Sequence, residues 1–321
     1  MFYKDKVCVV TGASGFVGTH MTKALLEAGA RVRAIVRERP MIVKDPRLEL
    51  VQADLADQQA CRRTLKGGEI VFHCAGAVSA AGVTATNPMS AITANLTLTA
   101  NVLEAGWAVG VDRVQIFGSS TGYPVSDYPI REDEMWSGPT HPSYFGYGWM
   151  RRYLERMGEF VHQKGGTKVV LVRPTATYGR HDNFDPLASH VVPALIRKAV
   201  AKMTPFEVWG TGDEIRDFLH ITDLVCGCLL AAEKLPTCDP VNIGYGKVIT
   251  VREIVGLILE AAGHDAEIVF DATKPTTIPV RLVDCDKAKR LLGFEPKLSL
   301  KDGLSDTVRW YCGELAAGRM A

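Results

Sequence analysis

The stretch VCVVTGASGFVG, residues 7–18, decides how the rest of this chain is organised. Its first four residues are apolar and predict a short strand that is buried on both faces. Glycines then follow at a spacing of three. Gly12 permits a tight turn, Gly15 lets a pyrophosphate approach the backbone, and Gly18 allows a helix to pack closely on the strand. The stretch therefore predicts the strand, turn and helix start of a dinucleotide site.

A helix is expected over residues 16–28, with Gly29 ending it. Its N-terminus offers unpaired N–H groups and a partial positive charge to phosphates. A glycine-rich turn without a ligand would show the same spacing, but the strand before it and the helix after it favour the dinucleotide site. The residues expected against the cofactor at this turn are Gly12, Ser14, Gly15, Phe16, Val17 and Gly18.

Charge balance and cysteine usage exclude several classes of protein. The chain has 37 Lys and Arg against 36 Asp and Glu, and its net charge of +1 creates no general field for nucleic acid or an anionic membrane. No apolar run approaches the ~20 residues that a membrane helix needs. Eight scattered cysteines and the start MFYKDK, which lacks an apolar signal region, predict a reduced, cytoplasmic protein. Cys226 and Cys228 have no nearby partners to complete a zinc set, so no metal is expected.

Apolar runs and helical segments alternate along the first half of the chain. This alternation predicts an α/β fold, a Rossmann-type doubly wound parallel sheet. The helix expected over 89–107 carries a single charged residue, Glu104, so another surface should cover it. The proline-rich segment 122–142 is expected to be a loop over the site. Strands are expected at 7–10, 31–36, 48–52, 70–74, 113–117 and 168–174, and helices at 57–65, 89–107 and from about 147.

The second half of the chain predicts a smaller lobe that is assembled from separated pieces. We assign residues 1–174 plus 218–243 to a dinucleotide-binding domain, and 175–217 plus 244–321 to a discontinuous C-terminal substrate lobe. Within these parts we expect a hairpin over 206–212, a return to the sheet at 216–220, a closing strand at 241–244, and helices at 251–262, 286–292 and 305–315.

The end of the second expected strand predicts the choice of cofactor. In a dinucleotide fold an acidic residue there accepts a hydrogen bond from the ribose 2′-hydroxyl of NAD. This chain has Arg37 instead, with Arg39 nearby, and guanidinium groups suit a 2′-phosphate. An ordinary solvated loop would also carry such arginines. The position favours NADP(H) over NAD(H).

Several segments resemble a known family. The motif TGASGFVG at 11–18 is similar to the TGxxGxxG motif of the extended short-chain dehydrogenase/reductases, the NAD-dependent epimerase/dehydratase family. Longer segments resemble the GDP-L-fucose synthases of that family, which act on a GDP-4-keto-6-deoxy sugar. The resemblance implies an NAD(P)-dependent oxidoreductase whose C-terminal lobe binds a nucleotide sugar, with a GDP-sugar favoured. The matching segments are 178–198, 206–224, 241–254 and 274–304.

The resemblance also implies further cofactor contacts and a dimer. The family places an acid beside the adenine and a turn of small residues against the cofactor. It pairs two helices with their copies, here around 90–107 and 147–163, so a homodimer is implied. Burial of the charge-poor helix within the chain is the alternative. The cofactor residues added by resemblance are Asp54, Leu55, Cys74, Ala75, Gly76, Tyr147, Arg151 and Pro174.

Reduction of a 4-keto group needs a hydride and a proton donor beside the carbonyl oxygen. Tyr147 matches the family's tyrosine, and Ser119 matches the serine that hydrogen-bonds the same oxygen. Tyr147 could otherwise be a packed helix aromatic. The family's lysine four residues later is Arg151 here. An arginine can hold ribose hydroxyls, but it does not readily release a proton, so the usual proton relay is in doubt.

Epimerisation needs a base and an acid on opposite faces of the sugar. His190 matches the family's histidine. Thr121 is at the position of the family's cysteine, and a hydroxyl is a poorer base than a thiolate. The sequence therefore predicts 4-keto reduction with weak or no 3,5-epimerisation. A nucleotide-sugar epimerase or dehydratase that holds NAD(P) tightly, and a non-catalytic NADP-binding protein, are the alternatives. The candidate substrate residues are Ser120, Thr121, His190, Arg197, Lys198, Trp209, Arg216 and Arg281.

Overall fold

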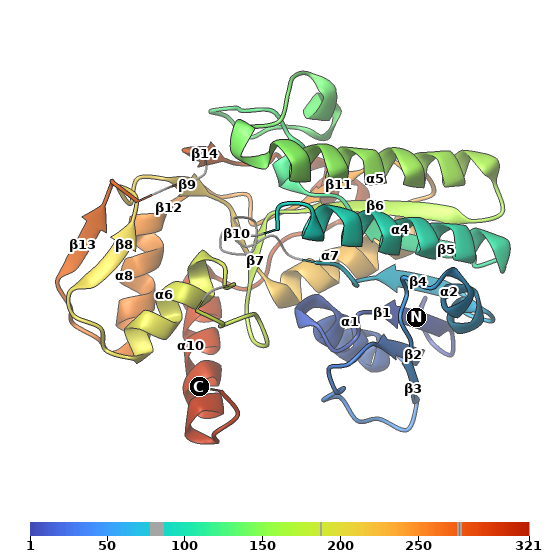
Figure 1. Ribbon diagram of the computed structural model, residues 1–321, viewed down its shortest axis with the longest axis horizontal. Helices are drawn as coiled ribbons and strands as arrows, with labels where there is room; N and C mark the ends of the chain where they lie inside the picture. The colour runs from blue at the N-terminus through green and yellow to red at the C-terminus, as the bar shows by residue number, and fades with distance from the viewer. Residues whose placement is uncertain (78–86, 187, 275, 277, 321) are drawn as a thin grey trace.

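A computed structural model describes residues 1–77, 87–186, 188–274, 276 and 278–320 (Figure 1). Its centre is a seven-stranded parallel sheet in the order β11-β6-β5-β4-β1-β2-β3. This order confirms the predicted Rossmann-type doubly wound fold. The strands are β1 (Val7–Thr11), β2 (Arg31–Val36), β3 (Leu48–Gln52), β4 (Ile70–His73), β5 (Arg113–Phe117), β6 (Lys168–Pro174) and β11 (Val241–Ile243).

Helices cover both faces of this sheet, and a separate apolar cluster lies under each layer. One layer contains α1 (Phe16–Glu27), α7 (Ile221–Lys234) and α9 (Asp286–Leu292). The other contains α2 (Gln58–Leu65), α4 (Ser90–Ala108) and α5 (Phe145–Lys164). Within the described residues, no helix is long and apolar enough to cross a membrane.

Local signals in the sequence account for the ends of several elements. Asp57 begins α2 because its carboxylate accepts a hydrogen bond from the amide of Gln59 at 2.8 Å. Gly12 has a φ of +61°, and a Cβ on it would lie 2.7 Å from the Cα of Ala75. The turn after β1 therefore requires glycine where it meets the chain after β4. These two strands are neighbours at the point where the sheet order reverses.

A second core lies beside the sheet and belongs mostly to the later chain. Its helices are α6 (Val191–Val200), α8 (Val251–Ala262) and α10 (Leu300–Ala316). Short strands join it: β7 (Ala176–Tyr178), β8 (Phe206–Trp209), β9 (Ile215–Arg216), β10 (Phe218–His220), β12 (Ile249–Thr250), β13 (Ile268–Asp271) and β14 (Val280–Arg281).

Three sequence-based expectations for this second region are wrong. The segment 206–212 is no hairpin, because β8 pairs in parallel with β13 and β9 pairs with β12 and β14. The Glu214 carboxylate accepts from the amides of Thr211 and Gly212 and so holds the intervening turn. The segment 216–220 does not return to the main sheet, because β10 pairs with β7. The last helix starts at Leu300, after the cap Ser299, and not at 305.

The segment 122–142 is more ordered than a plain loop. It follows the one-turn 3₁₀ helix η1 (Ser120–Gly122) and contains a second, η2 (Glu132–Trp136). A small apolar cluster of Tyr123, Ile130, Met135 and Val283 forms under it. Ile130 and Val283 form a β-bridge, so the chain that follows β14 supports this loop.

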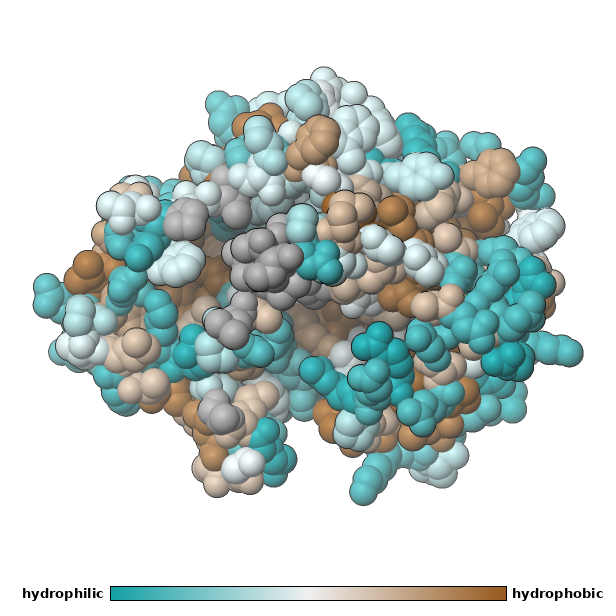
Figure 2. Space-filling model, in the orientation of Figure 1, coloured by the Kyte–Doolittle hydropathy of each residue, from teal (hydrophilic) through white to brown (hydrophobic). Residues whose placement is uncertain are grey.

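Exposed aromatic and apolar side chains remain along α4 and α5, which pack on each other. Figure 2 shows brown and pale residues over these two helices, whereas the surface over α2 is mostly teal. The single charged residue of α4, Glu104, pairs with Arg62 of α2. The exposed side chains are Met89, Trp107, Phe145, Trp149, Tyr153 and Phe160.

Candidate active site

Two hydroxyl groups meet in the turn that follows β5. The hydroxyl oxygens of Ser119 and Thr121 are 2.8 Å apart, and the amide of Thr121 donates to the Ser119 hydroxyl at 3.2 Å. Ser119 thereby caps the short η1 helix. The turn lies at the carboxyl end of the parallel sheet, where ligands of such sheets bind. Ser120, the third predicted residue of this turn, is buried.

Tyr147 and Arg151 lie one helical turn apart on α5 and are hydrogen-bonded to each other. The Arg151 Nη2 donates to the Tyr147 hydroxyl at 2.5 Å, and its Nη1 donates to the carbonyl of Phe117 at 3.4 Å. The guanidinium carbon is 5.0 Å from the centre of the Tyr147 ring. Arg151 thus connects the phenol to the end of β5. The bond is charge-assisted, because the donor is a guanidinium.

Close packing brings α5 against the Ser119–Thr121 turn. A Cβ on Gly148 would lie 2.7 Å from the carbonyl oxygen of Thr121. The residue after Tyr147 must therefore be small for the helix and the turn to touch. This contact places the predicted acid, Tyr147, and the two hydroxyl groups on neighbouring backbone segments.

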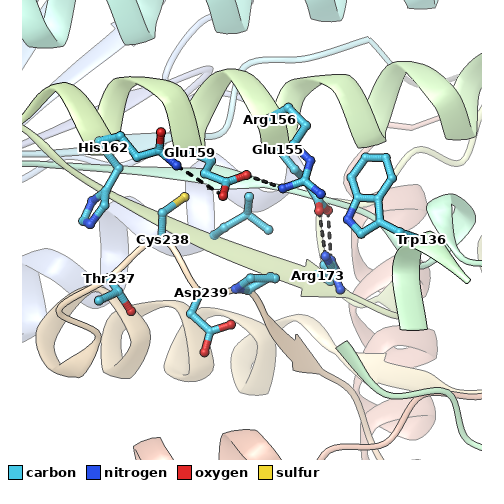
Figure 3. A pocket seen from close by; sticks show the side chains of 12 residues that line it. Trp136, Glu155, Arg156, Glu159, His162, Arg173, Thr237, Cys238 and Asp239 are labelled. Atoms are coloured by element: carbon cyan, nitrogen blue, oxygen red, sulfur yellow. Dashed lines mark hydrogen bonds and ion pairs between the residues drawn. The ribbon is translucent and has the colours of Figure 1, made fainter. Parts of the chain in front are cut away.

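A buried ion pair of Glu155 and Arg173 packs against Gly118, the residue before Ser119, and Figure 3 shows the pair. Arg173 of β6 donates from Nε and Nη2 to the carboxylate of Glu155 on α5, at 2.9 and 2.7 Å. A Cβ on Gly118 would overlap that carboxylate, so the pair packs directly under the residue that precedes Ser119. Burial alone would lower the pKa of Arg173, but Glu155 and the Tyr123 hydroxyl raise it above its ordinary value. On its outer side the pair borders a cavity of about 380 Å³.

The turn after β4 is held by polar groups that the sequence did not single out. The Thr11 hydroxyl accepts from the amide of Ala75 at 3.0 Å and lies 2.8 Å from Nδ1 of His73. The other ring nitrogen of His73 lies 3.2 Å from the Thr99 hydroxyl. Burial, with a smaller effect from the charge of Arg151, lowers the pKa of His73 to about 4, so this ring is neutral. His73 supports the turn in which the predicted residues Cys74, Ala75 and Gly76 lie.

Asn95 of α4 is a second supporting residue of the same turn. Its side-chain amide donates to the carbonyls of Ala77 at 2.8 Å and Ala91 at 2.6 Å. A Cβ on Gly76 would lie 2.8 Å from its oxygen, so the turn and α4 are in close contact. The signal in the sequence was an asparagine in a helix of low charge, and the structure shows that Asn95 is buried.

A pocket of about 470 Å³ opens beside the ends of β2 and β3. Arg37 and Asp54 both line it, together with Ser90 and Thr93 from the start of α4. The structure therefore brings together two of the residues predicted for the adenosine half of the cofactor, Arg37 and Asp54. Arg37 is exposed, and its Nε lies 3.3 Å from the Glu38 carboxylate.

The other predicted cofactor residues surround the two turns or lie beside this pocket. Gly15 is the N-cap of α1, with Ser14, Phe16 and Val17 partly buried around it. Gly18 packs against the carbonyl of Gly12. Arg39 is exposed and does not line the pocket. Leu55 is buried, and its carbonyl accepts from Asn101, while Pro174 ends β6.

Arg216 and Arg281 are direct neighbours in the register of β9 and β14. Arg281 is buried and donates to the carbonyls of Pro124 at 3.0 Å and Tyr123 at 3.5 Å. Its Nε has no partner among the described residues. Burial and the adjacent Arg216 lower the pKa of Arg281 to about 10. Two neighbouring guanidinium groups form a positive site that suits a diphosphate.

The remaining predicted substrate residues are spread over α6 and β8. His190 is exposed and is the N-cap residue of α6. Lys198 donates to the carbonyl of Glu207 at 2.9 Å, which uses one of the three donors of its ammonium group. The Nε of Arg197 has no partner within the described part of the chain. Trp209 is about half exposed at the end of β8.

The chain is similar to known proteins over most of its length. The profile of the NAD dependent epimerase/dehydratase family matches residues 8–244. GDP-L-fucose synthase 1 of Arabidopsis thaliana is 32% identical, over 96% of this chain and 94% of its own length. The dTDP-4-dehydro-6-deoxy-D-allose reductase of a Streptomyces species is 30% identical over 96% and 97%. The UDP-glucose 4-epimerase structure from Thermotoga maritima has a TM-score of 0.85, with 27% identity over 96% and 99%.

Proposed function

The chain belongs to the NAD dependent epimerase/dehydratase family, and we propose that it reduces the 4-keto group of a GDP-4-keto-6-deoxy-hexose with NADPH, with weak or no 3,5-epimerisation. Its relatives include a GDP-L-fucose synthase and a dTDP-sugar reductase, and the general activity is that of an NAD(P)-dependent nucleotide-sugar reductase or epimerase. The observations that carry the proposal are the hydrogen bond of 2.5 Å from Arg151 to the Tyr147 hydroxyl and the contact of α5 with the turn that carries the Ser119–Thr121 hydroxyl pair.

The residues present fit a bound dinucleotide. Gly12 and Gly15 leave the start of α1 open to a pyrophosphate, and Arg37 and Asp54 line one pocket. The bound nicotinamide supplies the hydride. In our proposal Tyr147 donates its phenolic proton to the carbonyl oxygen, and Ser119 donates a hydrogen bond to the same oxygen. Arg151 stabilises the phenolate left on Tyr147, and solvent returns the proton because a guanidinium does not release one.

Weak epimerisation is proposed from the side chains that would act as base and acid. Thr121 shares a hydrogen bond of 2.8 Å with Ser119, and its alkoxide is out of reach at neutral pH. His190 is then the single titratable residue left of the predicted pair. One imidazole can exchange protons at one carbon, but inversion at C3 and C5 needs groups on both faces.

Further parts of the proposal concern the cofactor, the substrate and the assembly. Arg37 in the adenosine pocket supports NADPH over NADH. The Arg216–Arg281 pair supports a diphosphate substrate. The exposed aromatic residues of α4 and α5 support a homodimer through these helices. We keep residues 1–174 plus 218–243 as the cofactor domain and 175–217 plus 244–321 as the nucleotide-sugar lobe.

A solvent-exchange assay tests this function. The enzyme is incubated with GDP-4-keto-6-deoxy-mannose in D₂O, first without and then with NADPH, and C3 and C5 are followed by NMR and mass spectrometry. We expect NADPH oxidation with little deuterium at either carbon, and faster exchange in Thr121→Cys. Rapid uptake at both carbons by the wild type would contradict weak epimerisation.

Cofactor retention, NADPH consumption and turnover separate the alternatives. A cofactor that stays bound through purification, with turnover of the sugar and no net NADPH consumption, would indicate an epimerase or dehydratase. The similarity to the Thermotoga maritima epimerase structure is the reason to test for this outcome. Tight NADPH binding without turnover of any GDP-, UDP- or dTDP-sugar would indicate a non-catalytic protein.

A further inference from the structure

Arg152, the residue after Arg151, is buried although it carries a charge. Its side chain is 2% exposed. Its Nε donates to the carbonyl of Gly122, and its Nη2 donates to the carbonyl of Gly138, each at 2.7 Å. The guanidinium carbon is 4.7 Å from the Trp149 ring centre and 5.3 Å from that of Trp136. Two carbonyls and two indole faces therefore surround this cation.

No carboxylate in the described chain is within ion-pair distance of Arg152. The exposed neighbour Arg156 differs, because it pairs with Glu159 and also stacks on Trp136 at 4.2 Å. Burial of a cation without a counter-ion in direct contact is costly unless its donors are satisfied. The two carbonyls and the aromatic rings offset that cost, and the charge of the nearby Glu155 carboxylate adds to them. An apolar residue of similar length would avoid it altogether, so packing by itself does not explain the arginine.

The two carbonyls belong to the two ends of one loop. Gly122 is the last residue of η1 and directly follows Thr121, and Gly138 is near the loop's return to α5. Arg152 therefore closes the loop 122–138 with a single side chain. It lies one helical turn beyond Gly148, at which α5 touches the carbonyl of Thr121. The bonded end of the loop is the turn that carries Ser119 and Thr121.

We propose that Arg152 is a positioning residue, which holds the Ser119–Thr121 turn at its working distance from Tyr147. This inference rests on the proposed reductase function. Gly148 permits the contact of helix and turn, and Arg152 bonds the carbonyl at the end of η1, so that the turn cannot move away from α5. Arg151 fixes the phenol and Arg152 fixes the hydroxyl groups that face the same oxygen of the substrate.

The test compares Arg152→Met, which keeps the length but removes the donors, with the matched control Arg156→Met on the next turn. We expect kcat for reduction of GDP-4-keto-6-deoxy-mannose to fall about 10- to 100-fold in Arg152→Met, as for a misplaced reacting group. The Kd for NADPH should stay within about twofold, since the cofactor turns follow other strands. Arg156→Met should keep the wild-type kcat.

Amide hydrogen exchange gives a readout that does not depend on turnover. The amides of Gly122 and Tyr123 donate to the carbonyls of Ser119 and Ser120 within η1. They should exchange faster in Arg152→Met and not in Arg156→Met. Arg152→Lys keeps the charge but cannot reach both carbonyls, so it should show the same changes to a smaller extent.

The outcomes separate this inference from the function on which it rests. Wild-type kcat and exchange in a folded Arg152→Met would overturn the positioning role. If Arg152→Met fails to fold, wild-type kcat in Arg152→Lys would overturn it, and a lowered kcat with unchanged NADPH affinity would support it. A wild-type protein that turns over no nucleotide sugar contradicts the proposed function alone, because the exchange experiment still tests the turn.

Discussion

Glu155→Gln removes the charge of one carboxylate and keeps its shape. In the folded protein Glu155 accepts two hydrogen bonds from Arg173, and both side chains are nearly inaccessible to solvent. Arg173 keeps two other acceptors, the Tyr123 hydroxyl and the carbonyl of Glu132, each at 2.8 Å. The variant therefore leaves a buried guanidinium that is still hydrogen-bonded but has lost its counter-ion.

The expected loss of unfolding free energy is about 3–5 kcal/mol, the range for removal of one partner from a buried ion pair. The side-chain amide oxygen can still accept one of the two hydrogen bonds, so the loss consists of the charge and of one charged hydrogen bond of about 1.5–3 kcal/mol. Because the Glu155 carboxylate fills the space beside Gly118, a shift of this side chain should also disturb the Ser119 turn. Activity should fall together with stability.

The assay is equilibrium unfolding in urea followed by tryptophan fluorescence, with Glu159→Gln as the matched control. Glu159 lies one turn later on α5 and pairs with Arg156 at the surface (Figure 3). An exposed pair of this kind contributes about 0–1 kcal/mol. A loss below about 1 kcal/mol in Glu155→Gln, or equal losses in the two variants, would refute the reasoning.

Three other predictions concern the cofactor, the acid and pH. Tyr147→Phe should lower kcat by about 100-fold or more with nearly unchanged NADPH affinity, because only the phenolic proton is lost; near wild-type turnover would remove Tyr147 from the mechanism. Arg37→Asp should weaken NADPH far more than NADH in fluorescence titrations, through a lost charged pair and new repulsion; equal changes would contradict the NADP preference. Burial lowers the pKa of both His20 and His181, at the contact of α1 with the second region, from 6.5 to about 4. At these two sites the unfolded chain therefore takes up protons first, and their contribution to the melting temperature should be largest above pH 6.5 and fall towards pH 4; an unchanged pH dependence in the double variant His20→Gln, His181→Gln would contradict this contribution.

Much of the sheet could be read from the sequence, because its signals are local. The runs 31–36, 48–52 and 113–117 have the predicted bounds. The first and the last are mostly buried, as expected of apolar runs in a parallel sheet, whereas 48–52 is the partly exposed edge strand. The helix 251–262 also has the predicted bounds, with Thr250 and Glu253 forming a capping box at its start. The spacing of Tyr147 and Arg151 predicted one helix face, and their hydrogen bond lies there.

The pairing of distant segments needed the tertiary structure. The strand β8 pairs with β13, some sixty residues later, and not with the nearby β9 that a hairpin would use. Gly210-Thr211-Gly212 is a good turn sequence in either arrangement. Local propensity therefore did not choose between them, and the apolar faces of α6 and α8 packed against β8 did.

The sequence by itself determined the α/β class, the glycine turn after β1 and the types of residue that face it. Only the tertiary structure decided which charged side chains are buried. The spacing from Tyr147 singles out Arg151, but Arg152, Arg156 and Arg173 look alike in a sequence. Arg152 closes a loop, Arg156 is exposed and Arg173 is in a buried ion pair. A charge can be buried only where distant carbonyls, carboxylates or rings meet it. Those partners come from other strands and loops, and the packing of the whole chain brings them into place.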